Sequence, residues 1–174
     1  MKTVFLCKGE AMRKLFFVPV LTAALLCGCG KSESVKPEKL APEFTAQVSF
    51  TEREQDFKAD MSRKEDGGWS FTFTEPETIK GLTLSEADKV VSISMGGLNY
   101  IADPSQLAET SPVKQIAKVT DKLVSGKGVE VGAVKQNVTQ LKGSIDDTDF
   151  TARLKKGKLL SMKIGEELVV SFKY

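Results

Sequence analysis

The sequence predicts a mainly β domain of the α+β class, with a curled antiparallel sheet or half-open barrel of about 8–10 strands around one amphipathic helix. Three observations lead to this prediction. Apolar and polar residues alternate with a period of two through most of the chain from Phe44 onward, as in strands that are wet on one face. The links between the alternating segments are short, which favours antiparallel neighbours. A single segment, residues 111–126, has the helical period instead.

The first half of the domain predicts six strands. Phe44 and its successors alternate with polar residues, and the turn Asp66-Gly67-Gly68 precedes an aromatic strand that ends at Pro76. Gly96-Gly97 makes a tight link between the last two strands. The predicted strands span residues 44–50, 57–62, 69–74, 79–84, 91–95 and 98–101.

One helix follows. Ser111 is a suitable N-cap, Pro112 suits the first helical position and Gly126 can end the helix. Lysines take the solvent side, so the opposite stripe should be buried against the sheet. That stripe consists of Val113, Ile116, Ala117, Thr120, Leu123 and Val124.

Further strands are predicted after the helix. Residues 134–145 form one strand with a bulge, because the alternation changes parity between Val138 and Leu141. Strands at 150–155, 160–164 and 168–172 follow, and the last two are joined by a two-residue hairpin at Gly165-Glu166.

The single helix implies that the sheet curls. A flat sheet of this many strands would be roughly 40 Å wide at about 4.8 Å per strand. A helix is only about 10 Å across, and leaving the remaining apolar surface in water would cost about 25 cal/mol per Å². A sheet that curls around its helix avoids this cost, and it can retain an apolar hollow for an apolar ligand.

The start of the chain predicts export. Arg13 and Lys14 follow a possible start at Met12, and an apolar stretch of about a dozen residues comes next, too short to span a membrane. Leu26-Cys27-Gly28-Cys29 then resembles the lipobox of bacterial lipoproteins, with Cys29 as the residue that carries the diacylglyceryl group. An ordinary secretory signal is the alternative. The predicted organisation is a signal peptide at 1–28, the lipidated cysteine and a flexible tether at 29–42, and a single β-rich domain at 43–174.

The charge balance argues against nucleic acid. Residues 1–28 hold four of the 25 basic and one of the 23 acidic residues, so the remainder carries 21 basic and 22 acidic residues. No basic stripe with interleaved aromatic residues is present. We therefore expect no nucleic-acid partner, and we expect a monomer.

The missing residue types argue against catalysis. The sequence has no histidine, and its cysteines are Cys7, Cys27 and Cys29. Zinc sites built on Cys or His, histidine bases and histidine-dependent nucleophiles are thereby excluded from the domain. We expect a protein that is not an enzyme and has no cofactor or metal.

Three weaker patterns have simpler explanations. Ser111 and Lys114 match the Ser-x-x-Lys spacing of penicillin-binding enzymes, but the partner motifs are absent and an N-cap explains the serine better. Asp146, Asp147 and Asp149 could hold calcium, although acidic turns are common. The basic turn at residues 155–158 could contact anionic headgroups, although a solvated hairpin end is the simpler explanation.

The chain resembles the lipoprotein-carrier superfamily (LolA/LolB-like). The resemblance is carried by the run Gly68 to Phe73, by Gly81-Leu82 and by Gly96-Gly97-Leu98 within the stretch from Pro76 to Ile101. It covers residues 43–174 in pattern and order, and departs in having one clear helix where more are expected. It implies an unclosed barrel that holds acyl chains or lipoproteins in its concave side.

The expected function is therefore that of an extracytoplasmic lipoprotein, anchored in a membrane through its lipid, that binds or carries a hydrophobic ligand such as an acyl chain or another lipoprotein. The alternative is an envelope interaction or scaffold lipoprotein with a filled core. Gly30 after Cys29 favours the outer membrane in a cell that has one, and otherwise the outer face of the plasma membrane. The expected ligand-binding residues are Trp69, Phe71, Phe73, Ile116 and Leu123.

Overall fold

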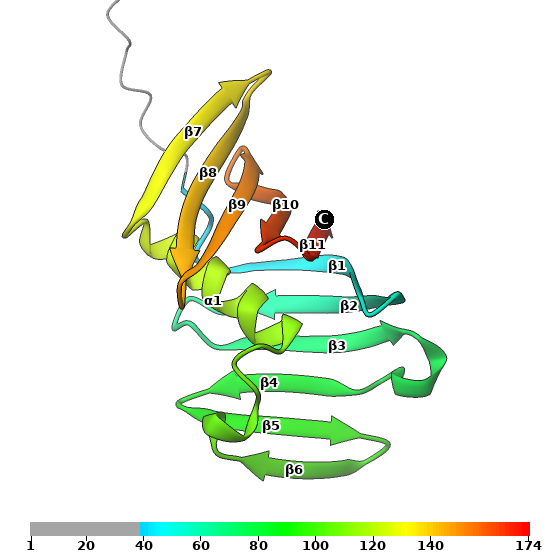
Figure 1. Ribbon diagram of the computed structural model, residues 1–174. Coiled ribbons are helices and arrows are strands. Elements are labelled where there is room, and N and C mark those ends of the chain that lie inside the picture. Colours follow the sequence, from blue (N-terminus) through cyan, green and yellow to red (C-terminus); the bar gives the residue numbers. More distant parts are fainter. Residues whose placement is uncertain (1–38) are drawn as a thin grey trace, which may run out of the picture. The chain divides into compact units, whose positions relative to one another are not determined.

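Eleven strands form one antiparallel sheet in residues 39–174, the part of the chain that the computed structural model describes (Figure 1). The predicted signal peptide, Cys29 and most of the predicted tether lie outside these residues. The strands are β1 (Phe44–Glu52), β2 (Gln55–Arg63), β3 (Trp69–Glu75), β4 (Thr83–Ala87), β5 (Val90–Met95), β6 (Leu98–Ala102), β7 (Val129–Lys135), β8 (Val138–Ile145), β9 (Thr148–Lys155), β10 (Lys158–Ile164) and β11 (Leu168–Lys173).

The sheet is made of two meanders joined in the middle. Its strand order is β6-β5-β4-β3-β2-β1-β11-β10-β9-β8-β7, so the first strand pairs with the last, with Val48 opposite Phe172. Strands β6 and β7 are the two free edges, and the sheet is therefore open. The predicted fold class, a curled antiparallel sheet with one helix, is confirmed.

The hairpin turns explain two wrong predictions. Six of the links are two-residue turns with both residues at positive φ, as the twist of a hairpin requires. One of them, Gln136-Asn137, divides the predicted strand 134–145 into β7 and β8, so the parity break there marks a turn and not a bulge. The second wrong prediction concerns the link between β10 and β11. Ile164 pairs with Leu168, so the predicted two-residue turn at Gly165-Glu166 is a three-residue loop.

The segment after Pro76 also differs from its prediction. A short 3-10 helix, η1 (Glu77–Ile79), stands where a strand was expected to begin, and β4 starts only at Thr83. A second one, η2 (Pro104–Gln106), lies between β6 and the helix. Asp103 caps η2, because its side chain accepts a hydrogen bond from the Ser105 N–H at 2.9 Å.

The predicted helix is confirmed as α1 (Pro112–Ser125). The Ser111 hydroxyl accepts from the Lys114 N–H at 3.4 Å, and Gly126 ends the helix with φ at 69°. The left-handed conformation at Gly126 is one that glycine adopts without steric cost. Lys118 and Lys122 are partly exposed, as expected, but Lys114, expected on the solvent side, is buried. The predicted apolar stripe is buried except for Val124, which is half-buried.

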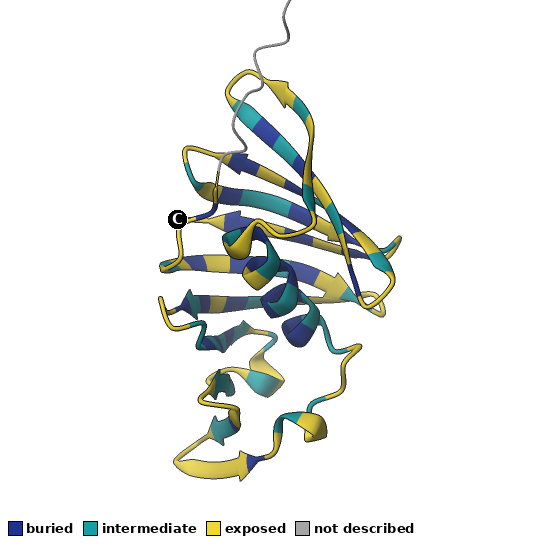
Figure 2. Ribbon diagram, turned by 90° about the vertical axis from the view of Figure 1, so that its left-hand side faces the viewer, coloured by how far each residue is buried: buried dark blue, intermediate teal, exposed yellow. Residues whose placement is uncertain are grey.

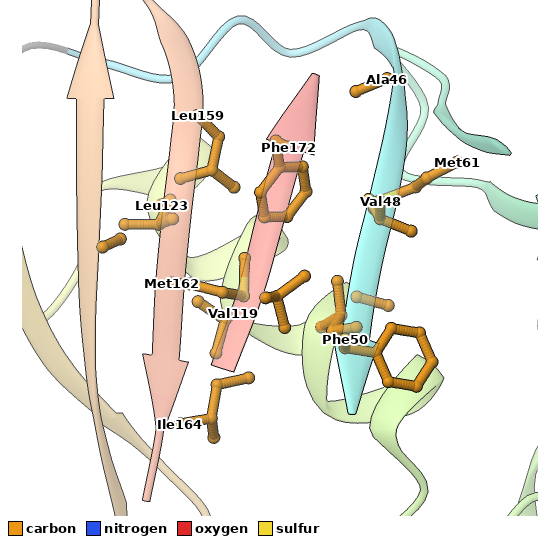
Figure 3. Close-up of a cluster of buried hydrophobic side chains, with 14 of the residues drawn as sticks. Ala46, Val48, Phe50, Met61, Val119, Leu123, Leu159, Met162, Ile164 and Phe172 are labelled. Carbon is orange, nitrogen blue, oxygen red and sulfur yellow. The ribbon is translucent and has the colours of Figure 1, made fainter. Parts of the chain in front are cut away.

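The core lies between α1 and one face of the middle strands, which we call the concave face (Figure 2). Residues on neighbouring antiparallel strands that pair directly point to the same face. Ala46, Val48 and Phe50 of β1 therefore share this face with their buried partners on β2 and β11. Figure 3 shows Val119 and Leu123 of α1 lying against Leu159 and Met162 of β10. Within the described residues the core runs from Leu40 to Phe172.

Candidate functional site

The residues predicted to bind a ligand meet in one place, and that place is the filled core. Trp69, Phe71 and Phe73 are 7%, 0% and 5% exposed. Ile116 and Leu123 of α1 are 0% and 1% exposed. With the helix in this position these five side chains are covered by other side chains. As ligand-binding residues they stay a prediction, and in this structure they are core residues.

The apolar face continues beyond the helix onto β4, β5 and β6. Phe71 pairs with Leu84, which pairs with Ile93, which in turn pairs with Tyr100. All four side chains therefore point to the concave face. Beside this row, Met95 pairs with Leu98. We call the apolar side chains of this face outside the buried core the apolar wing: Leu82, Leu84, Ile93, Met95, Leu98 and Tyr100. Glu86 of β4, which pairs with Trp69 and Val91, points to the same face beside the apolar wing.

Exposure rises across the apolar wing with distance from the helix. Leu82, Leu84 and Ile93 are half-buried. Farther out, Met95 is 42% exposed, Tyr100 57% and Leu98 80%. In Figure 2 the helix lies over strands coloured as buried, while β4–β6, at the lower end, are largely intermediate or exposed. The half-barrel is thus filled in its middle and open over this side, and it presents a contiguous apolar surface there.

The segment between β6 and α1 borders the apolar wing and is held in place by Lys114. This lysine is buried, and its Nζ donates to the carbonyls of Pro104 and Leu107 at 3.1 and 3.3 Å. It also forms an ion pair with Glu109 at 2.5 Å. Leu107 packs against the core. The Lys114 side chain therefore fixes the border by satisfying its carbonyls, and the Ser111 hydroxyl is the N-cap of α1.

Ion pairs link α1 to the neighbouring segments and hold it over the core. Lys118 pairs with Glu109 on one side and with Asp146 of the β8–β9 turn on the other. These pairs raise the pKa of Lys118, with Asp146 as the main cause. Hydrogen bonds from Lys114 and Lys118 lower the pKa of Glu109 to about 2. Asp146, which sequence reasoning considered as a calcium ligand, thus has a lysine as its partner.

The clearest other hollows are open and of mixed polarity. The largest, of about 740 Å³, lies beside the start of α1 and between the β1–β2 and β10–β11 turns, where glutamates line it. Among the described residues, no group of three or more His, Cys, Asp or Glu side chains is placed to hold a metal ion. Within the same part of the chain, no helix has the length and apolar character to cross a membrane.

Comparisons with known proteins give similarity to solved structures only. No protein-family model matches the sequence, and no curated protein matches it. An uncharacterized conserved protein from Thermus thermophilus is similar in structure with a TM-score of 0.48 and 12% identity, over 74% of this chain and 76% of that one.

Two further similar structures are those of named proteins. A LolA superfamily protein from Nitrosomonas europaea matches with a TM-score of 0.40 and 10% identity, over 80% of this chain and 86% of that one. LprF from Mycobacterium bovis matches with a TM-score of 0.37 and 13% identity, over 75% and 84%. The superfamily that the sequence resembles is thus represented among these structures, and the likeness concerns the fold.

Proposed function

We propose that this protein is an extracytoplasmic lipoprotein that binds a hydrophobic ligand, an acyl chain or the acylated end of another lipoprotein, on the apolar wing. One observation carries the proposal. The apolar concave face continues from the core to Leu98 and Tyr100, which are 80% and 57% exposed, and the Tyr100 hydroxyl donates to the Gln106 side chain of η2 at 3.4 Å at the border of this surface. Large exposed apolar patches on soluble domains commonly mark binding sites.

The chemistry of the apolar wing suits a flexible chain better than a rigid polar ligand. Its six side chains are aliphatic, thioether or phenolic, and none is charged. Methionine and leucine adapt to irregular apolar shapes. Each methylene that leaves water contributes about 0.8 kcal/mol before ordering costs. An acyl chain laid across β4–β6 would cover side chains that are now exposed to water.

Membrane attachment is part of the same proposal. Its support is the sequence Leu26-Cys27-Gly28-Cys29 after a short apolar stretch, with Cys29 as the lipidated residue. Two acyl chains give stable anchoring, where one gives only marginal binding. Replacing Cys29 by serine should therefore move the protein from the membrane fraction to the soluble fraction, and the mass of the membrane form should show the lipid.

Ligand binding is tested by titrating residues 39–174 with a fluorescent fatty acid. The test variant replaces Met95, Leu98 and Tyr100 by serine. The matched control replaces Val90, Ile101 and Val169, which are 43%, 66% and 53% exposed, by serine on the opposite face. We expect the test variant to lose at least tenfold in affinity, because each lost apolar contact contributes about 1 kcal/mol or more. Equal affinity of both variants, or no uptake by the parent protein, would sink the proposal.

A second candidate is an interaction protein whose partner adds a strand to β6. The two-residue turn at Gly96-Gly97 makes Met95–Leu98 a hydrogen-bonded pair, so the backbone groups of Asn99 and Ile101 face away from the sheet. Strand β6 has no charged residue, whereas the other edge, β7, has a bulge and Glu130. Bulges and charges are common protections of sheet edges.

The two candidates respond differently to one substitution. Asn99→Pro removes an outward N–H and no backbone hydrogen bond to β5, so the hairpin should remain folded. Asn99→Ala is the matched control, because both variants lose the hydrogen bond that the Ser92 hydroxyl of β5 donates to Asn99 Oδ1 at 2.8 Å. Fatty-acid uptake should survive the proline substitution, while strand addition at β6 should not. A partner that binds the parent and the proline variant equally would contradict strand addition.

A further inference from the structure

One end of the sheet is strongly basic. Three lysines surround the β9–β10 turn, and others lie at the ends of the neighbouring strands. All are exposed, and none of them forms an ion pair among the described residues. We call them the basic rim: Lys39, Lys135, Lys155, Lys156, Lys158 and Lys173. Lys158 lies over the Tyr174 ring, 4.9 Å from its centroid, with its charge still open to solvent.

The other end of the same strands is acidic. Strands β9 and β10 lead from the basic rim to the turns that hold Asp146, Asp147, Glu166 and Glu167. The neighbouring β1–β2 turn adds Glu52 and Glu54 around Arg53. Strands of seven or eight residues span about 25 Å. The charges of this half of the sheet are therefore unevenly distributed along the strands, although the chain without residues 1–28 is nearly neutral. Lys163 and the Asp146 partner Lys118 also lie at the acidic end, and Glu43 lies at the basic end.

The described part of the chain begins at the basic rim. Leu40 is buried in the core, and the Ala41 N–H donates to the Gly157 carbonyl at 3.2 Å, between Lys156 and Lys158. The Lys39 carbonyl lies 3.5 Å from the point where a Cβ on Gly157 would sit. Residues 1–38 therefore join the folded unit at its basic end and not at its acidic end.

We propose that the basic rim docks on the anionic headgroups of the membrane that holds the protein. This inference rests on the proposed lipid anchor at Cys29. Nine residues lie between Cys29 and Lys39. The ten steps from one to the other span at most about 35 Å of extended chain, so the rim stays close to the bilayer. A basic surface near anionic lipids gains about fivefold in partitioning per lysine. The acidic end is repelled by the same surface, so the charge separation sets which end faces the membrane.

A lipid surface fits the rim better than a nucleic acid does. The lysines lie at the tips and ends of hairpins, where they can contact a flat surface together. The aromatic side chains near them are Tyr174 and the partly buried Phe44, whose ring centroids are 6.3 Å apart. Stacking platforms for bases need more aromatic residues.

The test uses residues 39–174, which contain the core described above, and vesicles of phosphatidylcholine with or without phosphatidylglycerol. We expect binding in co-sedimentation only when phosphatidylglycerol is present, and weaker binding as salt rises, because the Debye length shortens to about 10 Å at 0.1 M. The variant Lys155→Gln, Lys156→Gln, Lys158→Gln should bind roughly 100-fold more weakly, from about fivefold per lysine. The matched control, Lys80→Gln, Lys127→Gln, Lys163→Gln, changes net charge equally away from the rim and should bind as the parent does.

The outcomes separate this inference from the proposed ligand function. An equal loss of vesicle binding in both triple variants would overturn docking by the rim. Binding to pure phosphatidylcholine vesicles that does not depend on salt concentration would overturn it too. Absence of binding to phosphatidylglycerol vesicles would overturn it as well. Fatty-acid uptake, measured on the same rim variant, should be unchanged. If the protein binds vesicles but does not take up fatty acid, only the ligand proposal is contradicted. If the parent protein is found in the soluble fraction, as the Cys29→Ser variant is, the lipid anchor on which docking rests is contradicted.

Discussion

Arg63 at the end of β2 and Asp121 on α1 join parts of the chain that are 58 residues apart. Arg63 donates from Nε and Nη2 to Oδ1 of Asp121 at 2.9 and 2.8 Å. Its Nη1 also donates to the carbonyls of Pro42 and of Lys64, the latter at 3.0 Å. The guanidinium is only 7% exposed. One side chain therefore fixes the helix, the start of the folded unit and the β2–β3 turn together.

Arg63→Ala should lower the free energy of unfolding by about 1–3 kcal/mol, because the part-buried contacts to the Pro42 and Lys64 carbonyls and to Asp121 would lose their donor. Asp121→Asn should cost only about 0–1 kcal/mol, since Asp121 is half exposed to water. Arg63→Lys should restore little, because an ammonium cannot reproduce the guanidinium fork. Urea unfolding of the three variants measures this order. Equal losses for Arg63→Ala and Asp121→Asn would show that the ion pair, and not the carbonyl contacts, is what matters.

Leu123→Ala should be among the most destabilising single changes. Leu123 is buried between α1 and β10, beside Leu159 and Met162 (Figure 3). Truncating a buried leucine leaves a cavity and costs about 2–5 kcal/mol. Val169→Ala, at a position 53% exposed on the opposite face, should change stability by less than about 0.5 kcal/mol. Chemical unfolding midpoints compare the two. A small loss at Leu123 would mean that the helix does not pack on the sheet as described.

Gly143→Ala should destabilise the β8–β9 pair. A Cβ at Gly143 would lie 2.7 Å from Cζ of Phe150 and 2.9 Å from the Gly128 carbonyl oxygen. Both neighbours are fixed, one by the core and one by the backbone, so the loss should be about 1–3 kcal/mol. Gly132→Ala is the control, because its new Cβ meets only the flexible Lys142 side chain, at 3.0 Å or more. Thermal unfolding of both variants checks this, and similar midpoints for both would contradict it.

Much of the fold follows from local patterns, because period-two alternation and helix caps act within a few residues of each other. Ser111, Pro112 and Gly126 bound the helix as their chemistry predicts. The turn at Gln136-Asn137 was not predicted, because it contains no glycine and the residues on both sides of it alternate as in one long strand. Asparagine adopts the left-handed backbone conformation more readily than most residues, so Asn137 was the one indication of a turn in this sequence.

The candidate site followed from the sequence only in part. The inward face of Trp69, Phe71 and Phe73 was predictable, but Leu84, Ile93 and Tyr100 alternate in the same way. What distinguishes the two groups is which strands the 14-residue helix covers. A helix of that length spans about 21 Å, and its position across the sheet depends on contacts such as Arg63–Asp121 that no local pattern encodes. The apolar wing is therefore a tertiary property.

Acid should weaken the fastening of the helix through Glu109. Hydrogen bonds from Lys114 and Lys118 lower the pKa of Glu109 in the folded protein from 4.5 to about 2. The stabilisation is thus fully present above pH 4.5, where the unfolded chain is also ionised, and it is lost as the pH falls from there toward 2, because the unfolded state binds the proton first. Glu109→Gln should remove this part of the pH dependence, leaving that of Asp103, whose pKa the Ser105 hydroxyl also lowers. Asp147→Asn, at a carboxylate without an ion pair among the described residues, is the control. Melting temperatures recorded across this pH range decide the matter: if Glu109→Gln loses stability on acidification as steeply as the parent and Asp147→Asn do, the two lysines do not hold the helix through Glu109.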